Sequence, residues 1–176
     1  MTTLILISFM TIAIYTAIVS IKSGIPYSIS ETYYRINHKK WFTFVMLFTT
    51  ITLLPVALEY SLENNQFLIF LSVAGMAIVG LSPNFIYGEK SEQIAHYIGS
   101  GMLLIFSQCW VGCNLPWALT WWIVYVMWII FNFNKSNPKQ SFYDRLVSTK
   151  PVFYAEIIVM ITVYATVLRE YLFYVS

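Results

Sequence analysis

The chain has 176 residues, of which 59% are hydrophobic and 10% charged, and its formal net charge is +2. Soluble domains carry about 25% charged residues, and a chain this apolar could not cover a soluble surface with polar groups, so a soluble fold is excluded. The small net charge also argues against a nucleic-acid partner. The length leaves room for one domain, which we take to be a single integral membrane domain over residues 1–176.

Six segments with few or no charges follow one another along the chain, each long enough to cross a bilayer. Because each is apolar almost all round, its backbone must satisfy its own hydrogen bonds as a helix. The sequence therefore predicts an all-α fold, a bundle of six transmembrane helices. The predicted spans are residues 3–21, 41–58, 67–85, 95–113, 116–133 and 151–168.

Two of the loops between these spans are expected to contain short helices. Ser28 and Glu31 have the spacing of a capping box, and Ser141 with Asp144 is a weaker variant of the same motif. We expect these helices to lie on the membrane at the cytoplasmic interface. The alternative is that each is a capped extension of the next span.

The basic residues predict the sidedness of the bundle. Nine of the ten lysines and arginines lie in or beside the loops after the first, third and fifth spans, and the tenth is Arg169. Short cytoplasmic loops retain positive residues. In the cell inner membrane we therefore expect these loops to face the cytoplasm and both termini to lie on the outer side. Trp41, Trp110 and Trp117 fall at span ends, where indole rings prefer the headgroup region.

Glu156 is an acidic residue within a predicted span, about 7–8 Å from the inner end of that helix. Carboxylates inside membranes are costly and usually face the bundle interior or a water-filled cavity. His96 opens the fourth span from the same side at a similar depth. We therefore predict that His96 and Glu156 face each other near the cytoplasmic end of the bundle. The alternatives are a histidine at the interface with one hydrogen bond, and a carboxylate that favours the N-terminus of the last helix.

Asn84 and Glu31 are the other polar residues expected near this pair, on the inner side of the membrane. Together with His96 and Glu156 they form the candidate polar site, in which no residue is assigned a catalytic role. An enzyme needs two or three reactive groups around one pocket. Whether these four side chains converge therefore separates an enzyme from a binding protein.

No metal site or cofactor is expected. One histidine and one glutamate fall short of a closed metal site, no lysine lies within a span to hold retinal, and no P-loop, HExxH or K⁺-filter pattern occurs. Cys109 and Cys113 are one helical turn apart, a spacing with poor disulfide geometry, and we interpret them as packing residues. The neighbouring Gln108 is interpreted as a hydrogen-bonding residue between helices.

Small residues recur in the third and fourth spans. Ala95 and Gly99 have small-xxx-small spacing, and Gly75 and Gly80 add small positions in the preceding span. Such residues let helix backbones approach closely. We expect these two spans to pack centrally, either within one chain or across a homo-oligomer. Membrane lipid is the other expected partner.

Three stretches carry a resemblance to known proteins. They are GIPYSISETYY at 24–34, LPVALE at 54–59 with ENNQF at 63–67, and AHY at 95–97. Together they resemble small uncharacterised multispan membrane proteins of anaerobic bacteria and their phages, over about the first 110 residues. The resemblance implies a grouping and assigns no activity, cofactor or site residue.

The sequence therefore favours a non-enzymatic membrane protein that binds, or lets pass, a small solute or lipid. The alternative is a membrane-embedded enzyme that acts on a lipid headgroup at the cytoplasmic interface.

Overall fold

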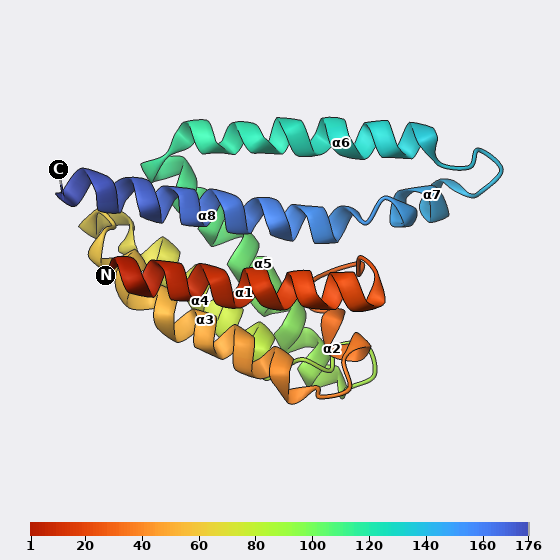
Figure 1. The fold of residues 1–176 in the computed structure, drawn as a ribbon, viewed down its shortest axis with the longest axis horizontal. Helices are drawn as coiled ribbons and strands as arrows, with labels where there is room; N and C mark the ends of the chain where they lie inside the picture. The colour runs from red at the N-terminus through yellow and green to blue at the C-terminus, as the bar shows by residue number, and fades with distance from the viewer. Residues whose placement is uncertain (176) are drawn as a thin grey trace.

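Helices make up the fold in the computed structural model, which describes residues 1–175 (Figure 1). Eight α-helices and two short 3₁₀ helices follow one another, and no strand occurs in the part of the chain that is described. The predicted all-α class is confirmed. The elements are α1 (Thr2–Ser23), α2 (Thr32–Arg35), α3 (Lys40–Glu59), η1 (Glu63–Asn65), α4 (Gln66–Leu81), α5 (Lys90–Asn114), η2 (Pro116–Thr120), α6 (Trp121–Lys135), α7 (Phe142–Ser148) and α8 (Pro151–Val175).

Six stretches of helix are long and apolar enough to cross a bilayer, in the order that the sequence predicts. Several boundaries differ from the prediction, and the sixth span continues to Tyr174 rather than ending near 168. The third span ends at Leu81 rather than near 85, because helices usually end at or before the residue that precedes a proline, here Pro83. The fourth begins at Lys90 rather than near 95, because charged residues such as Glu92 are accommodated in its first turn. The six spans are Thr2–Ser23, Lys40–Glu59, Glu63–Leu81, Lys90–Asn114, Pro116–Lys135 and Pro151–Tyr174.

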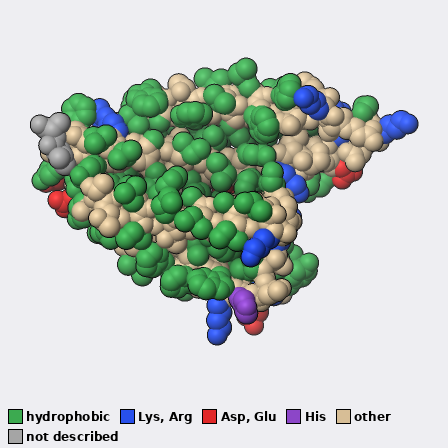
Figure 2. All heavy atoms as spheres, viewed as in Figure 1, with side chains coloured by type: hydrophobic (Ala, Val, Ile, Leu, Met, Phe, Trp, Pro, Cys, Tyr) green, Lys and Arg blue, Asp and Glu red, His purple; other side chains and the backbone are tan. Residues whose placement is uncertain are grey.

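The outer surface of the helices is apolar. Figure 1 shows α8 between α1 and α6, with α3 and α4 on the other side of α1. No residue of α6 is buried, and large side chains such as Ile51 (70% exposed) and Ile123 (62%) point outward. Figure 2 shows hydrophobic side chains over most of the visible face and charged ones near its edges. An apolar surface of this extent indicates contact with lipid.

Helices α4 and α5 approach each other through glycine. A Cβ atom added to Gly75 would lie 2.5 Å from the carbonyl oxygen of Gly99, and one added to Gly99 would lie 2.8 Å from that of Gly75. Ser72 Oγ also donates to the carbonyl of Leu103 at 3.2 Å. Gly75 and Gly99 therefore pack against each other within one chain. Packing within the chain was one of the two predicted alternatives, and packing across a homo-oligomer was the other.

Buried hydrogen bonds join the helices away from the loops. Gln108 Oε1 accepts from Trp122 Nε1 at 2.8 Å, and its Nε2 donates to Thr162 Oγ1 at 3.2 Å, which links α5 to α6 and α8. The predicted role of Gln108 between helices is confirmed. Trp110, which was predicted at a span end, is fully buried, and its Nε1 donates to Ser61 Oγ at 2.8 Å.

Short helices follow both capping motifs, but only Ser141 lies at the N-cap of its helix. Helix α2 begins at Thr32, and its N-cap is Glu31 rather than Ser28. Ser28 Oγ accepts from the amide of Glu31, and Ser141 Oγ accepts from that of Asp144, each at 3.1 Å. Both helices are separate from the next span, so the alternative of a capped extension is wrong. The break before α8 lies at Lys150, which has a φ of 55° and is followed by proline in the first helical position. That α2 and α7 lie at the membrane interface stays a prediction.

Candidate functional site

His96 is buried in α5 and is satisfied by the loop that follows α4. Its Nδ1 lies 2.7 Å from the carbonyl oxygen of Ser82 and donates to it, and its ring stacks on Phe85 with 4.1 Å between centroids. Helix α4 ends at Leu81, next to this carbonyl, which accepts a hydrogen bond from the imidazole of His96. The histidine therefore fixes the end of α4 against α5.

Asn84 lies in the same loop and belongs to a second local network. Its Oδ1 accepts from the Tyr34 hydroxyl at 3.3 Å, and its amide donates to Glu92 Oε1 at 2.9 Å. The Tyr34 hydroxyl also accepts from the amide of Ile86 at 2.8 Å. Burial raises the pKa of Tyr34 above its usual value, so the hydroxyl stays protonated and able to donate at neutral pH.

Glu31 lies before α2 and is paired with a cation. Its Oε1 accepts from Nε and Nη2 of Arg35 at 3.0 and 2.9 Å, and its Oε2 accepts from the amide of Tyr27. Arg35 Nη1 also donates to the carbonyls of Ser23 and Gly24 at the end of α1. Gly24 has a φ of 78°, a conformation that favours glycine, so the chain turns sharply here. The Glu31–Arg35 pair therefore fixes the loop after α1.

Glu156 is held by that same loop rather than by His96. One of its carboxylate oxygens, Oε2, accepts from the amide of Ile29. The ion pairs among the described residues are Arg35–Glu31 and Arg169–Glu170, so the predicted His96–Glu156 pair is not formed. The physical reason is that each side chain has a nearer backbone partner, the carbonyl of Ser82 for one and the amide of Ile29 for the other. The four candidate residues thus do not converge: Glu31 and Glu156 bind the loop after α1, whereas His96 and Asn84 bind elsewhere.

A cavity of about 320 Å³ lies in the centre of the bundle, and Glu156 is part of its wall. Along α8 the lining extends from Pro151 to Tyr164, which corresponds to about 20 Å of helix. All six spans and the loop after α1 contribute to the wall. Its residues are mostly apolar, with Met46, Leu53, Ile69, Val73, Met76, Val79, Leu103, Val159 and Met160 among them.

Some of the polar side chains in the wall already have hydrogen-bond partners. Tyr164 and Ser8 share a hydrogen bond of 2.5 Å, and Tyr125 donates to the carbonyl of Pro151 at 3.0 Å. Four groups in the wall have no hydrogen-bond partner among the described residues. They are Oε1 of Glu156 and the hydroxyls of Thr49, Ser30 and Ser100. The cavity therefore offers a ligand one carboxyl oxygen and three hydroxyls.

The turn at residues 27–30 closes the loop-side end of the cavity. The carbonyl of Tyr27 accepts from the amide of Phe153 at 2.8 Å, an amide at the start of α8 that has no partner within its own helix. Ile29 and Ser30 line the cavity directly, and the amide of Ile29 binds Glu156. Two hydrogen bonds thus attach the turn to α8 beside the cavity.

Other reactive groups stay apart. Among residues 1–175, no three histidine, cysteine, aspartate or glutamate side chains are grouped so that they could hold a metal ion. Cys109 and Cys113 are free and exposed. The arrangement provides an apolar cavity with one carboxyl group, and only Glu156 of the four candidate residues lines it.

No protein-family model, curated protein or solved structure matches the chain. The resemblance to small multispan membrane proteins of anaerobic bacteria and their phages therefore stays a prediction.

The cavity itself was not predicted from the sequence. Thr49 and Tyr164 are two of its polar wall residues, and each lies in a segment that reads as an ordinary apolar span. The turn at 27–30 was predicted only as the start of a short helix. A signal was present in Glu156, because a carboxylate within a span usually marks a cavity.

Proposed function

We propose that the chain is a polytopic membrane protein that binds, or lets pass, a small amphipathic molecule inside its helix bundle. The observation that carries this proposal is the central cavity with Glu156 in its wall. An apolar cavity of about 150 Å³ accommodates a molecule as large as benzene, so a cavity of about 320 Å³ suits a somewhat larger apolar body.

The chemistry of the wall determines which polar group the ligand carries. Glu156 is the only acidic or basic side chain among the described residues that line the cavity. The carboxyl group of Glu156 accepts hydrogen bonds, and a bound amine would favour its ionised form. The ligand is therefore an apolar molecule that ends in a hydrogen-bond donor, preferably an amine.

An enzyme is not favoured by the geometry. The alternative, a membrane-embedded enzyme, requires two or three reactive groups around one pocket. His96, Asn84 and Glu31 each bind their own partners outside the cavity wall, and Glu156 alone lines it. We therefore propose binding or passage in preference to catalysis on a lipid headgroup.

The test compares three probes of equal chain length, namely decylamine, decanol and decanoate, by native mass spectrometry of the protein released from nanodiscs. We expect the amine to be retained best and decanoate least at neutral pH. In Glu156→Gln the preference of the amine over the alcohol should fall by about tenfold, since a hydrogen bond to a charged group contributes about 1.5–3 kcal/mol. Glutamine still accepts from the amide of Ile29, so the turn is retained. Equal retention of the three probes, unaffected by the substitution, would show that Glu156 does not contact a ligand.

The sidedness of the protein is part of the same proposal. Both termini lie at one end of the bundle in Figure 1, as an even number of spans requires. We propose that this end faces outward and that the end with nine basic residues faces the cytoplasm, in the cell inner membrane. In an otherwise cysteine-free chain, a cysteine at Asn64 should react with an impermeant maleimide added outside cells. A cysteine at Lys139 should react only after lysis. Labelling of both from the same side is incompatible with the proposed topology.

A homo-oligomer also stays a proposal, and the structure changes how it is tested. Gly99 already packs within the chain, whereas a Cβ atom on Gly101 would meet nothing within 4 Å. A contact between copies through α5 would therefore use the side of Gly101.

A further inference from the structure

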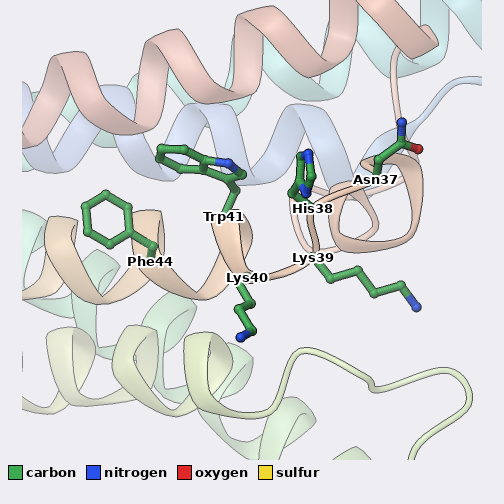
Figure 3. A pocket seen from close by; sticks show the side chains of 6 residues that line it. All are labelled: Asn37, His38, Lys39, Lys40, Trp41 and Phe44. Carbon is green, nitrogen blue, oxygen red and sulfur yellow. The ribbon is translucent and has the colours of Figure 1, made fainter.

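A groove runs along the outer surface between α1 and α3, separate from the central cavity. Its volume is about 860 Å³, and the loop that joins the two helices closes one end. Residues 37–44 at that end also line an adjoining pocket, which Figure 3 shows from close by. There the side chains of His38 and Trp41 extend toward α1, which forms the opposite wall.

The apolar part of the groove has the length of one membrane leaflet. Ile7, Met10, Ile14 and Ile18 follow one another at helical spacing along α1, and each is 40–49% exposed. From Ile7 to Ile18 the helix rises about 16 Å. The hydrocarbon core of a bilayer is about 30 Å thick, so this stripe matches the acyl chains of one leaflet.

The closed end of the groove is cationic. Lys22, Arg35 and His38 line it, and Lys39 and Lys40 follow directly in the sequence. Glu31 is the single carboxylate between residues 22 and 41, and Arg35 is paired with it. The other ion pair among the described residues is Arg169–Glu170, so Lys22 and Lys40 have no carboxylate partner.

The apolar and cationic parts of the groove meet near Trp41, where a lipid headgroup would lie. Trp41 is 56% exposed beside His38, and indole rings prefer the boundary between hydrocarbon and headgroups. Basic residues at this depth attract anionic lipid. A zwitterionic headgroup would leave the charge of Lys22 without a net counter-charge.

We propose that this groove binds one anionic phospholipid of the loop-side leaflet. An acyl chain lies along the α1 stripe, and the phosphate group lies beside Lys22 and His38. The site does not depend on the function proposed for the central cavity, because the groove and the cavity share no lining residue.

The experiment measures retention of phosphatidylglycerol and of phosphatidylcholine by native mass spectrometry after release from mixed nanodiscs. Wild type should retain phosphatidylglycerol preferentially, with one molecule bound most tightly. In the variant Lys22→Gln the preference should fall by about fivefold. The matched control is Lys139→Gln, which removes one lysine from the loop after α6 and should leave the tightest site unchanged.

A second variant tests the apolar half without changing any charge. Ile14→Trp places a larger side chain in the stripe and should weaken retention of the tightest lipid, whereas Ile130→Trp on the exposed surface of α6 should not. Equal retention of the two lipids by wild type would overturn the proposal. The same conclusion would follow if each variant and its control lost lipid to the same extent.

Discussion

Replacement of Gly75 by alanine is expected to lower the stability of the bundle by about 3 kcal/mol, the upper range for overpacking a core. The added Cβ atom would lie 2.5 Å from the carbonyl oxygen of Gly99 and 2.7 Å from the amide nitrogen of Leu103. Both are backbone atoms of the facing helix and cannot rotate away. Helices α4 and α5 would therefore have to separate, which also stretches the hydrogen bond of Ser72 to Leu103. Thermal unfolding in nanodiscs, followed by circular dichroism, measures the loss.

The matched control for this change is Gly101→Ala on α5. No atom lies within 4 Å of a Cβ added there, and alanine has a better helix propensity than glycine, so the variant should be as stable as wild type or slightly more stable. If both alanines had the same effect, close packing of α4 on α5 would not be what stabilises the pair. The mass of the wild-type particle in the same preparation shows whether the packing needs a second copy.

Replacement of Ser100 by phenylalanine is expected to abolish binding of decylamine, with at least a tenfold loss of retention. Ser100 lies on α5, is partly buried, and lines the central cavity. The aromatic ring would occupy space that a ligand needs, and an overfilled cavity can bind only at the cost of moving neighbouring side chains. Native mass spectrometry with the amine as probe measures the effect.

Ile98→Phe is the control for the phenylalanine. It lies on the same helix but is 55% exposed, so the ring should enter lipid and leave binding unchanged. Unfolding temperatures of the two variants separate loss of the cavity from loss of the fold. Full retention of decylamine by a folded Ser100→Phe protein would mean that the ligand binds elsewhere.

The number and order of the spans could be predicted because each depends on the composition of one segment. A run of about twenty apolar residues is enough to require a helix in lipid, whatever it packs against. The short helix α7 was predictable for a similar reason, since Ser141 caps it through the amide of Asp144. Local features of this kind need no knowledge of neighbouring helices.

The contacts of the candidate site could not be predicted, because they depend on helix rotation and on the loop backbone. His96 and Glu156 lie at similar depths, which the sequence does indicate, but the carbonyl of Ser82 and the amide of Ile29 are their actual partners. Backbone groups of this kind have no signature in the sequence. Trp110 shows the same limit. Nothing in the sequence indicates that its side chain is buried or that its indole donates to the hydroxyl of Ser61.

Photolabelling of the protein in nanodiscs with a decylamine that carries a diazirine in its alkyl chain tests the central cavity most directly. Peptide mapping by mass spectrometry identifies the labelled residues. We expect adducts on Met76 and Val79 of α4, Leu103 of α5 and Met160 of α8, with competition by unlabelled decylamine and none in Ser100→Phe. Adducts confined to outward-facing residues such as Ile123 and Val126 of α6, and unchanged in that variant, would contradict binding inside the bundle.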